Sequence, residues 1–300
     1  MEINPRYYNA EERMKALTEQ QVRDYKHDGY LFPVDALTPA ETAQALVDLE
    51  RTERTLGTPL PKAQKNFRTG AFTCLPWVEK LTRHPRILDI VEDVLGPDIL
   101  VFTATFFIKE PGAATFAAWH QDATYFGLTP YEHVTAWVAL TDASSEAGCM
   151  DVVSARGAPR QYYHAAARLD NSINGAGQVI AEPLDESGAV AMELKAGQLS
   201  LHHTLCPHRS APNRARHRRV GFGISYIPAH VRPNCDHRMS ALLVRGKDHG
   251  TFDLLPSPKA DLDPEGLAVN KAYFSKYTEH YQEQIERHER EFGPAREVHA

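Results

Sequence analysis

Two residues of types that bind transition metals, His120 and Asp122, lie two positions apart in the segment WHQDATYFG. In an extended segment, side chains at positions i and i+2 leave the same face, so this imidazole and this carboxylate would offer neighbouring ligand atoms. A third, neutral ligand from a distant strand would complete a facial set on iron(II), which leaves three octahedral positions open for chemistry. The alternative is a histidine that only hydrogen-bonds a nearby carboxylate.

The third ligand has four candidates in LSLHHTLCPHRSAPNRARHRRV, namely His202, His203, His208 and His217. LSLHHTLC alternates as a strand, and His203 falls on its leucine face, which predicts a core or interlayer histidine. Pro207 ends this strand and puts His208 at its mouth, where a ligand would project into a cavity. His217 lies in a charged turn and is expected to be solvated. His208 is therefore the predicted third ligand.

An arginine follows His208 by eleven residues and opens the segment RVGFGISY. If this segment is a strand, Gly221, Gly223 and Ser225 share the face of Arg219, and such small side chains would leave volume beside it. A guanidinium in that space is suited to two-point capture of the far end of a dicarboxylate. The alternative for Arg219 is a solvated surface charge.

The segments that must position these residues change character along the chain. The N-terminal third predicts helices, two of which begin at capping boxes formed by Thr18 with Gln21 and by Thr38 with Glu41; RILDIVEDVLGP is a third. From about 98 to 230, short segments rich in β-branched and aromatic residues predict many strands, as in a sandwich or barrel. These are ILVFTATFFIK, VTAWVALTD, VAMEL, LSLHHTL and RVGFGISYI.

The C-terminal segment NKAYFSKYTEHYQEQIERHEREF predicts a helix with Tyr273, Tyr277, Tyr281 and Ile285 on one face. This stripe packs either on its own domain or, as the alternative, on a second copy of the chain, which would make a homodimer through the C-terminal helix. The stretch NSINGAGQ, at 171 to 178, is the most loop-like part of the sequence and a candidate lid.

Composition narrows the class of protein. A chain of 300 residues with 42% hydrophobic content can bury a full core, and we expect one domain. A net charge of −6 without a basic run argues against nucleic-acid binding. No stretch approaches the roughly 20 apolar residues of a membrane span, and the polar start lacks a secretory signal, so we expect no membrane partner and a cytoplasmic location. The four cysteines form no CxxC pair, which indicates reduced thiols and neither a thiolate zinc site nor disulfides.

The residues described so far resemble the phytanoyl-CoA dioxygenase family of iron(II)/2-oxoglutarate oxygenases. The likeness covers most of the chain and depends on the order of the HxD pair, the later histidine and the arginine eleven residues beyond it. It runs through TEQQVRDYKHDGYLFP, WHQDATYFGLTP, HVTAWVALTDAS, GCMDVV and AGQLSLHHTLCPHRSAPNRARHRRVGFGISYIP.

This resemblance implies an α+β fold with a double-stranded β-helix core, of jelly-roll or cupin-like type, and flanking N- and C-terminal helices. One dioxygenase domain would span 1–300, with a helical part at about 1–97, the core at about 98–230 and a C-terminal extension and helix at about 231–300. The implied cofactors are Fe(II), 2-oxoglutarate and O2. The implied reaction hydroxylates, or otherwise oxidises, an unactivated C–H of a small molecule and releases succinate and CO2.

The resemblance also assigns roles to single residues. It implies that His120, Asp122 and His208 are the catalytic iron ligands. Arg219 would anchor the distal carboxylate of 2-oxoglutarate. Four further residues are candidates for contact with this co-substrate: Ser210, Trp137, Thr105 and Lys62. Trp137 also fits a plain core aromatic.

Substrate contacts are expected close to the metal, and the candidates are Tyr125, Phe126, Arg156 and Arg160. The two arginines could pair with an anionic substrate group or be solvated. They lie in SARGAPR, at 154 to 160, where many family members have a Pro-Gly-Ser-His turn, so substrate identity is left open. Without a basic cluster for a CoA phosphate, a small natural-product or amino-acid-like molecule is favoured over an acyl-CoA.

Three alternative activities share parts of this residue set. Related halogenating enzymes lack the carboxylate ligand, so Asp122 favours hydroxylation. A zinc or manganese hydrolase on the same ligands would need a general base and gives no task to Arg219. A non-catalytic jelly-roll binding module, with a structural metal or none, is the remaining alternative.

Overall fold

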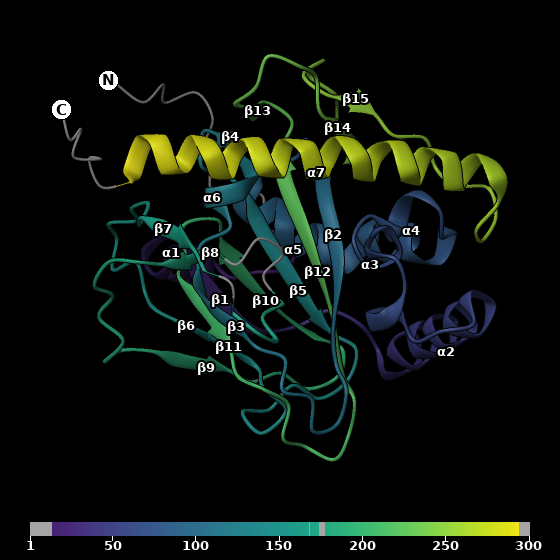
Figure 1. Cartoon of the computed structure of the whole chain (residues 1–300), viewed down its shortest axis with the longest axis horizontal. Coiled ribbons are helices and arrows are strands. Elements are labelled where there is room, and N and C mark those ends of the chain that lie inside the picture. The colour runs from purple at the N-terminus through teal and green to yellow at the C-terminus, as the bar shows by residue number, and fades with distance from the viewer. Residues whose placement is uncertain (1–13, 168, 174–177, 294–300) are drawn as a thin grey trace.

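A computed structural model describes residues 14–167, 169–173 and 178–293. Within them, the helices of the N-terminal part of the chain flank a β-core, and the C-terminal helix α7 lies across one end of that core (Figure 1). The helices are α1 (Glu19–Asp28), α2 (Pro39–Leu56), α3 (Lys65–Arg68), α4 (Pro76–Thr82), α5 (Pro85–Leu95), α6 (Ala123–Phe126) and α7 (Pro264–Phe292), with 3₁₀ turns η3 (Leu60–Lys62) and η4 (Ala71–Thr73).

The core contains a large and a small sheet. The large sheet is antiparallel except at its last pair and has the order β1 (Tyr30–Asp35), β10 (Gln198–His203), β5 (Val134–Ala139), β12 (Arg219–Pro228), β2 (Ile99–Lys109), β14 (Ser240–Arg245), β15 (Asp253–Leu254). The small sheet has the order β3 (Ala117–His120), β11 (His208–Ser210), β6 (Met150–Val152), β9 (Val190–Met192). Two short pairs complete the set: β4 (Leu128–Thr129) with β13 (Arg232–Pro233), and β7 (His164–Ala166) with β8 (Gln178–Ile180). This arrangement is the predicted jelly-roll core with flanking helices.

Local sequence signals fix the first two helices. Both predicted capping boxes are formed, since the side chain of Thr18 accepts from the backbone of Gln21, and that of Thr38 from Glu41. The carboxyl end of α1 is closed by Gly29, whose φ of 81° lies in the left-handed region that glycine adopts without a side-chain clash. The prediction of these two helices is confirmed.

The inward face of the large sheet is defined by its register. Two rows of directly opposed residues cross the four central strands β10, β5, β12 and β2. The first row is Ser200, Trp137, Gly223, Thr105, and the second is His202, Thr135, Ser225, Thr103. Because side chains alternate along each strand, both rows leave the same face of the sheet. The predicted grouping of Arg219 with Gly221, Gly223 and Ser225 is therefore correct.

The sheet extends beyond its predicted limits on both sides. The part expected to be helical contains β1, which pairs with β10 at one edge, and β14 and β15 extend the other edge to Leu254. β1 contains Pro33, and the register shifts between Leu31 and Val34. A proline has no N–H for a ladder, so it is tolerated at this irregular edge position. The limits of about 98 and 230 for the core were too narrow.

The tyrosine stripe of α7 packs on the chain's own core. Tyr273 donates its hydroxyl to the carbonyl of Phe102 at 2.9 Å, and Tyr277 is buried beside the same phenylalanine. The first of the two alternatives for this stripe is thus confirmed. Of the candidate lid, residues 174–177 lie outside the described residues.

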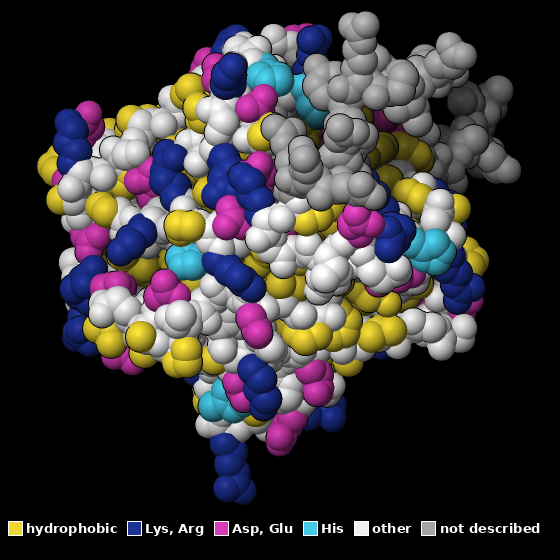
Figure 2. All heavy atoms as spheres, turned by 180° about the vertical axis from the view of Figure 1, so that it is seen from behind, with side chains coloured by type: hydrophobic (Ala, Val, Ile, Leu, Met, Phe, Trp, Pro, Cys, Tyr) yellow, Lys and Arg dark blue, Asp and Glu magenta, His cyan; other side chains and the backbone are white. Residues whose placement is uncertain are grey.

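The charges on the surface and the character of the helices can be compared with the expectation of no nucleic-acid and no membrane partner. On the face seen in Figure 2, basic and acidic side chains are interspersed and do not gather into separate fields. Among the described residues, no helix combines the length and the apolar character that crossing a membrane requires.

Candidate metal centre and pocket

His120, Asp122 and His208 converge between the two sheets. His120 ends β3 and His208 begins β11, and the two are direct partners across this antiparallel pair, with ring centroids 4.1 Å apart. Asp122 follows β3 at the start of α6. Its Oδ1 lies 4.0 Å from Nε2 of His120 and 3.8 Å from Nε2 of His208. One potential ligand atom from each residue lies within 4.8 Å of the other two, a spacing that a single ion could bridge.

Backbone carbonyls orient both imidazoles. Nδ1 of His120 lies 2.8 Å from the carbonyl of Ala118, and Nδ1 of His208 lies 3.0 Å from that of Cys206. A carbonyl only accepts hydrogen bonds, so Nδ1 carries the proton in each ring and Nε2 keeps its lone pair. Both lone pairs are thus available toward Asp122, which is the ring arrangement usual for histidines that bind a metal.

Burial and charge set the ionisation states of the three residues. Burial lowers the pKa of His120, and it holds the pKa of His208 well below its usual value. For Asp122 burial opposes ionisation, but the hydrogen bond that it accepts from His202 and the electrostatic interaction with the neighbouring imidazoles outweigh it and hold the pKa well below the usual range. Neutral imidazoles and an ionised carboxylate are the forms that bind a divalent ion.

Three further side chains hold the carboxylate of Asp122 in place. Tyr125 donates its hydroxyl to Oδ1, and Thr135 donates to Oδ2 at 3.1 Å. Nε2 of His202 lies 3.5 Å from Oδ2. His202 was one of the four candidates for the third ligand but was not selected, and the sequence pattern did not indicate Thr135. Strand parity could have found His202, because it lies on the face opposite the leucines of β10, together with Ser200.

The other candidate histidines do not join this group. Nε2 of His203 lies 2.6 Å from the carbonyl of Tyr131, and the residue is half-buried at the periphery of the molecule. His217 is exposed, and its Nε2 lies 2.9 Å from the carbonyl of Asp142. Of the candidates, only His208 and the unselected His202 face Asp122.

Two buried cations, Arg219 and Lys109, lie side by side, and Arg219 lines the pocket. Arg219 is directly opposite Lys109 in the ladder between β12 and β2, and neither has more than 1% of its surface exposed. Arg219 donates to the carbonyl of Gly148, while its Nε has no partner. Lys109 donates to Oγ of Ser210 at 2.8 Å. An unpaired buried donor costs free energy, so this part of the pocket is suited to a bound anion.

The glycines of β12 make room for aromatic rings as well as for a ligand. A Cβ on Gly221 would lie 1.8 Å from Cζ2 of Trp137, and one on Gly223 would lie 2.9 Å from Cε2 of Phe107. The indole therefore lies directly over Gly221, with the guanidinium of Arg219 5.3 Å from its ring centre. The volume predicted beside Arg219 is thus largely filled by Trp137. Trp137 itself lines the pocket, as expected.

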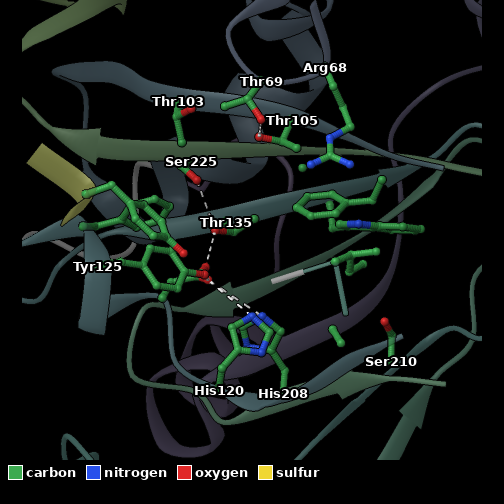
Figure 3. Close-up of a pocket in the computed structure, with 18 of the residues that line it drawn as sticks. Arg68, Thr69, Thr103, Thr105, His120, Tyr125, Thr135, His208, Ser210 and Ser225 are labelled. Carbon is green, nitrogen blue, oxygen red and sulfur yellow. Dashed lines mark hydrogen bonds and ion pairs between the residues drawn. The ribbon is translucent and has the colours of Figure 1, made fainter. Parts of the chain in front are cut away.

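Lys62 does not reach the pocket. It is exposed at the end of η3, whereas Lys65 and Arg68 of α3 line the cavity. The guanidinium of Arg68 enters from the side opposite His120 and His208 (Figure 3), and its Nε is buried without a partner. The residue after Arg68, Thr69, is held against β2, because its Oγ1 accepts a hydrogen bond from the hydroxyl of Thr105 at 3.1 Å. Arg68 and Lys65, and not Lys62, are the basic side chains of this segment that line the cavity.

The two loop arginines also lie outside the pocket. Arg156 approaches Asp185 at 3.7 Å, and Arg160 pairs with Glu182 at 3.1 Å, while both side chains are more than half exposed. Each is paired with a carboxylate of the segment that follows β8 and stays largely exposed, in agreement with the solvated alternative. Tyr125 and Phe126 do line the cavity, and their contact with a substrate stays a prediction.

The cavity has a volume of about 230 Å³ and is lined by both sheets, by α3 and by α7. Two nitrogens and one oxygen converge at one wall, and the guanidinium groups of Arg68 and Arg219 also line the cavity. Arg68 lies opposite His120 and His208 (Figure 3). Mixed imidazole and carboxylate donors with open positions suit iron(II), while the cations suit a small dianion. The residues present therefore fit both iron and 2-oxoglutarate.

Comparison with known proteins agrees with this geometry. The family model for phytanoyl-CoA dioxygenase matches residues 25–221. The chain is 24% identical over 229 residues, 71% of its length and 80% of the relative's, to a probable alpha-ketoglutarate-dependent hypophosphite dioxygenase of Stutzerimonas stutzeri. It is 32% identical to the apo form of the non-haem monooxygenase ThoJ, with a TM-score of 0.79 over 89% of this chain and 99% of that one. CytC3 with Fe(II) and alpha-ketoglutarate shares the fold at 20% identity, with a TM-score of 0.59 over 83% and 96% of the two chains.

The fold, the donor set and these relatives define the class: a non-haem iron enzyme that uses Fe(II), 2-oxoglutarate and O2. Within that class, the chain belongs to the phytanoyl-CoA dioxygenase family.

Proposed function

We propose that the protein hydroxylates a C–H bond of a small molecule, with iron held by His120, Asp122 and His208. The observation that carries this proposal is the convergence of their ligand atoms to within 4.8 Å, with both Nε2 lone pairs and an ionised carboxylate facing one point. Iron bound there would supply the coupling of dioxygen reduction to oxidative decarboxylation of 2-oxoglutarate.

The chain's own residues bind and orient the reactants. Arg219 pairs with the distal carboxylate of 2-oxoglutarate, and Ser210, which accepts a hydrogen bond from Lys109, contributes its hydroxyl. Trp137 and Thr105 line the same part of the pocket and exclude water from it. Exclusion of water strengthens these charge pairs and fixes the geometry of the reacting groups.

We infer that Arg68 contacts a second anionic group, which belongs either to the co-substrate or to the substrate. Its unpaired Nε faces a cavity whose opposite wall carries the metal ligands. Arg68→Gln separates the two sources, since it raises KM for 2-oxoglutarate in the first case and KM for the oxidised substrate in the second. Lys62→Gln, in the exposed turn nearby, is the matched control and leaves both values unchanged.

The two other functional classes have less support. A hydrolase on the same ligands gives no role to the buried pair Arg219 and Lys109, and a binding module would not require desolvated cations beside a metal centre. Neither class consumes oxygen. Purified protein with added Fe(II) and 2-oxoglutarate is therefore expected to form succinate and take up oxygen, and a suitable substrate increases both rates.

Asp122→Ala tests the centre itself. We expect loss of turnover by at least about 1,000-fold, because the charged ligand of the set is removed. The far-ultraviolet circular dichroism should stay unchanged, since the residue lies at a site and not in the apolar core. His249→Ala, an exposed histidine paired with Asp98, is the control and keeps full activity. Full turnover in Asp122→Ala, or its global unfolding, contradicts the assignment.

The protein's location and assembly are further proposals. We infer a cytoplasmic enzyme with reduced thiols, because all four cysteines are free in the structure. We also propose that 1–300 form one catalytic domain, since a single apolar cluster joins residues of α1, the large sheet and α7. A homodimer through α7 stays a prediction, which light scattering of the purified chain tests; fluorescence microscopy of the tagged chain tests the location.

A further inference from the structure

A second group of metal-binding side chains lies on the far side of α6 from the pocket. Cys235 and His237 belong to the loop between β13 and β14, and His280 comes from the middle of α7. One sulfur and two imidazole nitrogens of these residues all lie within 4.8 Å of one another. The loop is fastened close by, where the backbone of Asn234 donates to the carbonyl of Gly127 at 2.7 Å.

His280 is prepared to act as a ligand. The residue is completely buried, and its Nε2 lies 2.8 Å from the carbonyl of Phe126. That carbonyl can only accept, so Nε2 carries the proton and Nδ1 keeps its lone pair. Nδ1 is buried and has no hydrogen-bond partner. A buried acceptor without a partner costs free energy, and a cation bound beside it would remove that cost.

We propose that Cys235, His237 and His280 bind a zinc ion that is separate from the catalytic iron. A thiolate with two imidazoles is a donor set that zinc takes at about 2.3 Å for sulfur and about 2.0 Å for nitrogen. The three ligand atoms now lie up to 4.8 Å apart. Movement of the exposed His237 and of the half-buried Cys235 brings them to the distances of a tetrahedral site. Water takes the fourth position, because this side of the site is open to solvent. The sequence argued against a thiolate zinc site because the ligands are not spaced as CxxC.

Charges around Cys235 favour a cation. The carboxylates of Glu283 and Asp236 act electrostatically on the sulfur of Cys235, and Lys276 is the cation that opposes them. The thiol donates to the carbonyl of His237 at 3.1 Å when no metal is bound. Zinc displaces this proton, and it satisfies both the thiolate and the nearby negative charges.

The zinc site is connected to the catalytic pocket through one short helix. Phe126, whose carbonyl orients His280, ends α6, and the same helix carries Tyr125, which donates to Asp122. Bound zinc would tie the loop of Cys235 to α7 and hold α6 against both. The zinc ion thereby positions α6, which contributes Tyr125 and Phe126 to the pocket, and it does not take part in the reaction.

Cobalt(II) distinguishes this site from the iron site, because only a thiolate ligand gives an intense near-ultraviolet sulfur-to-cobalt charge-transfer band. We expect the purified full-length protein to develop this band with one equivalent of bound cobalt, and zinc to abolish it by displacement. Asp122→Ala keeps the band, since that variant affects only the catalytic centre. The band is lost in Cys235→Ser, and the affinity for cobalt falls by at least about 100-fold in His237→Ala.

Matched variants separate loss of the zinc site from loss of the fold. His249→Ala removes an exposed histidine elsewhere and leaves the cobalt titration unchanged, and circular dichroism establishes that Cys235→Ser is folded. Zinc also raises the melting temperature of Asp122→Ala, but not that of the double variant with Cys235→Ser. The absence of a band in wild-type protein, or a band that persists in Cys235→Ser, overturns the proposal. Neither result affects the proposed oxygenase activity, which is measured separately.

Discussion

Lys109 and Arg219 are direct partners across the ladder of β2 and β12, and both are buried; Arg219 lines the cavity, and Lys109 reaches it through Ser210. Two like charges placed together away from water are unfavourable unless an anion joins them. Each cation also keeps at least one contact with a neutral acceptor, Ser210 for the lysine and Gly148 for the arginine. The pair is thus a preformed site for a carboxylate, and it governs both the affinity for 2-oxoglutarate and the response of stability to pH.

Arg219→Ala should raise KM for 2-oxoglutarate by at least about 30-fold, because truncation of one partner of a buried charge pair costs about 2–5 kcal/mol. The affinity for iron(II) should change far less, since the guanidinium does not face the metal ligands. Steady-state kinetics and an iron titration measure the two quantities. Arg218→Ala is the matched control, because the neighbouring side chain leaves the opposite face and pairs with Glu53. Equal loss of both affinities would show that the strand phase is misassigned.

Lys109 should make the stability of the unliganded protein depend on pH. Burial, and next the charge of Arg219, lower its pKa from 10.5 to about 7. Between these values the unfolded chain binds more protons than the folded one, so the free energy of unfolding rises with pH, by up to about 1.4 kcal/mol per unit. Urea unfolding between pH 7 and pH 10 measures this slope. Lys109→Met and saturating 2-oxoglutarate should each flatten it, and parallel profiles for variant and wild type would refute the assignment.

The parts of the fold that could be predicted are those encoded locally. Capping boxes and strand-like composition act over a few residues, and they place α1, α2 and β12 correctly. β1 was missed because YLFPVD contains a proline and lacks strict alternation, and it becomes a strand only through pairing with β10. Such edge strands are determined by tertiary contacts more than by intrinsic preference.

His202→Ala should reduce the affinity for iron(II) by about 10–100-fold without abolishing turnover, as expected for a residue that orients a metal ligand. The reason is its position 3.5 Å from Oδ2 of Asp122, on the carboxylate's other side from His120 and His208. His203→Ala is an exacting control, because the adjacent histidine contacts the carbonyl of Tyr131 at the periphery. An iron titration with a chromophoric competitor measures both variants. Equal effects at the two positions would indicate general destabilisation.

The part of the candidate site that could be predicted is the part that depends on strand alternation and on where prolines interrupt the chain. β10 ends at His203, and Pro207 directly precedes β11, whose first residue, His208, pairs with His120. Distances between separate short helices, by contrast, leave no trace in the sequence. Lys62 and Arg68 are both basic and six residues apart, and only the fold decides that Arg68 enters the cavity. Likewise, Arg160 forms an ion pair with Glu182, a partner 22 residues away that no local pattern indicates.

Gly221→Ala tests whether the indole of Trp137 shapes the co-substrate pocket. The new Cβ would lie 1.8 Å from Cζ2 of Trp137, so the ring must move, and we expect a destabilisation of about 1–3 kcal/mol with a rise in KM for 2-oxoglutarate. Urea unfolding and kinetics measure the two effects. Gly188→Ala is the control, because its Cβ meets only the flexible end of Arg156 at 3.3 Å.

A second substitution identifies the cause of that effect. Trp137→Leu removes the part of the ring that the new methyl group would meet, so the double variant with Gly221→Ala should be at least as stable as Trp137→Leu alone. The two changes are then strongly non-additive, as expected for side chains in direct contact. Additive losses would mean that the new methyl group meets an element other than the indole. In that case the indole would not be the element that adjusts the volume next to Arg219, and the pocket's shape would depend on Phe107 and Gly223 instead.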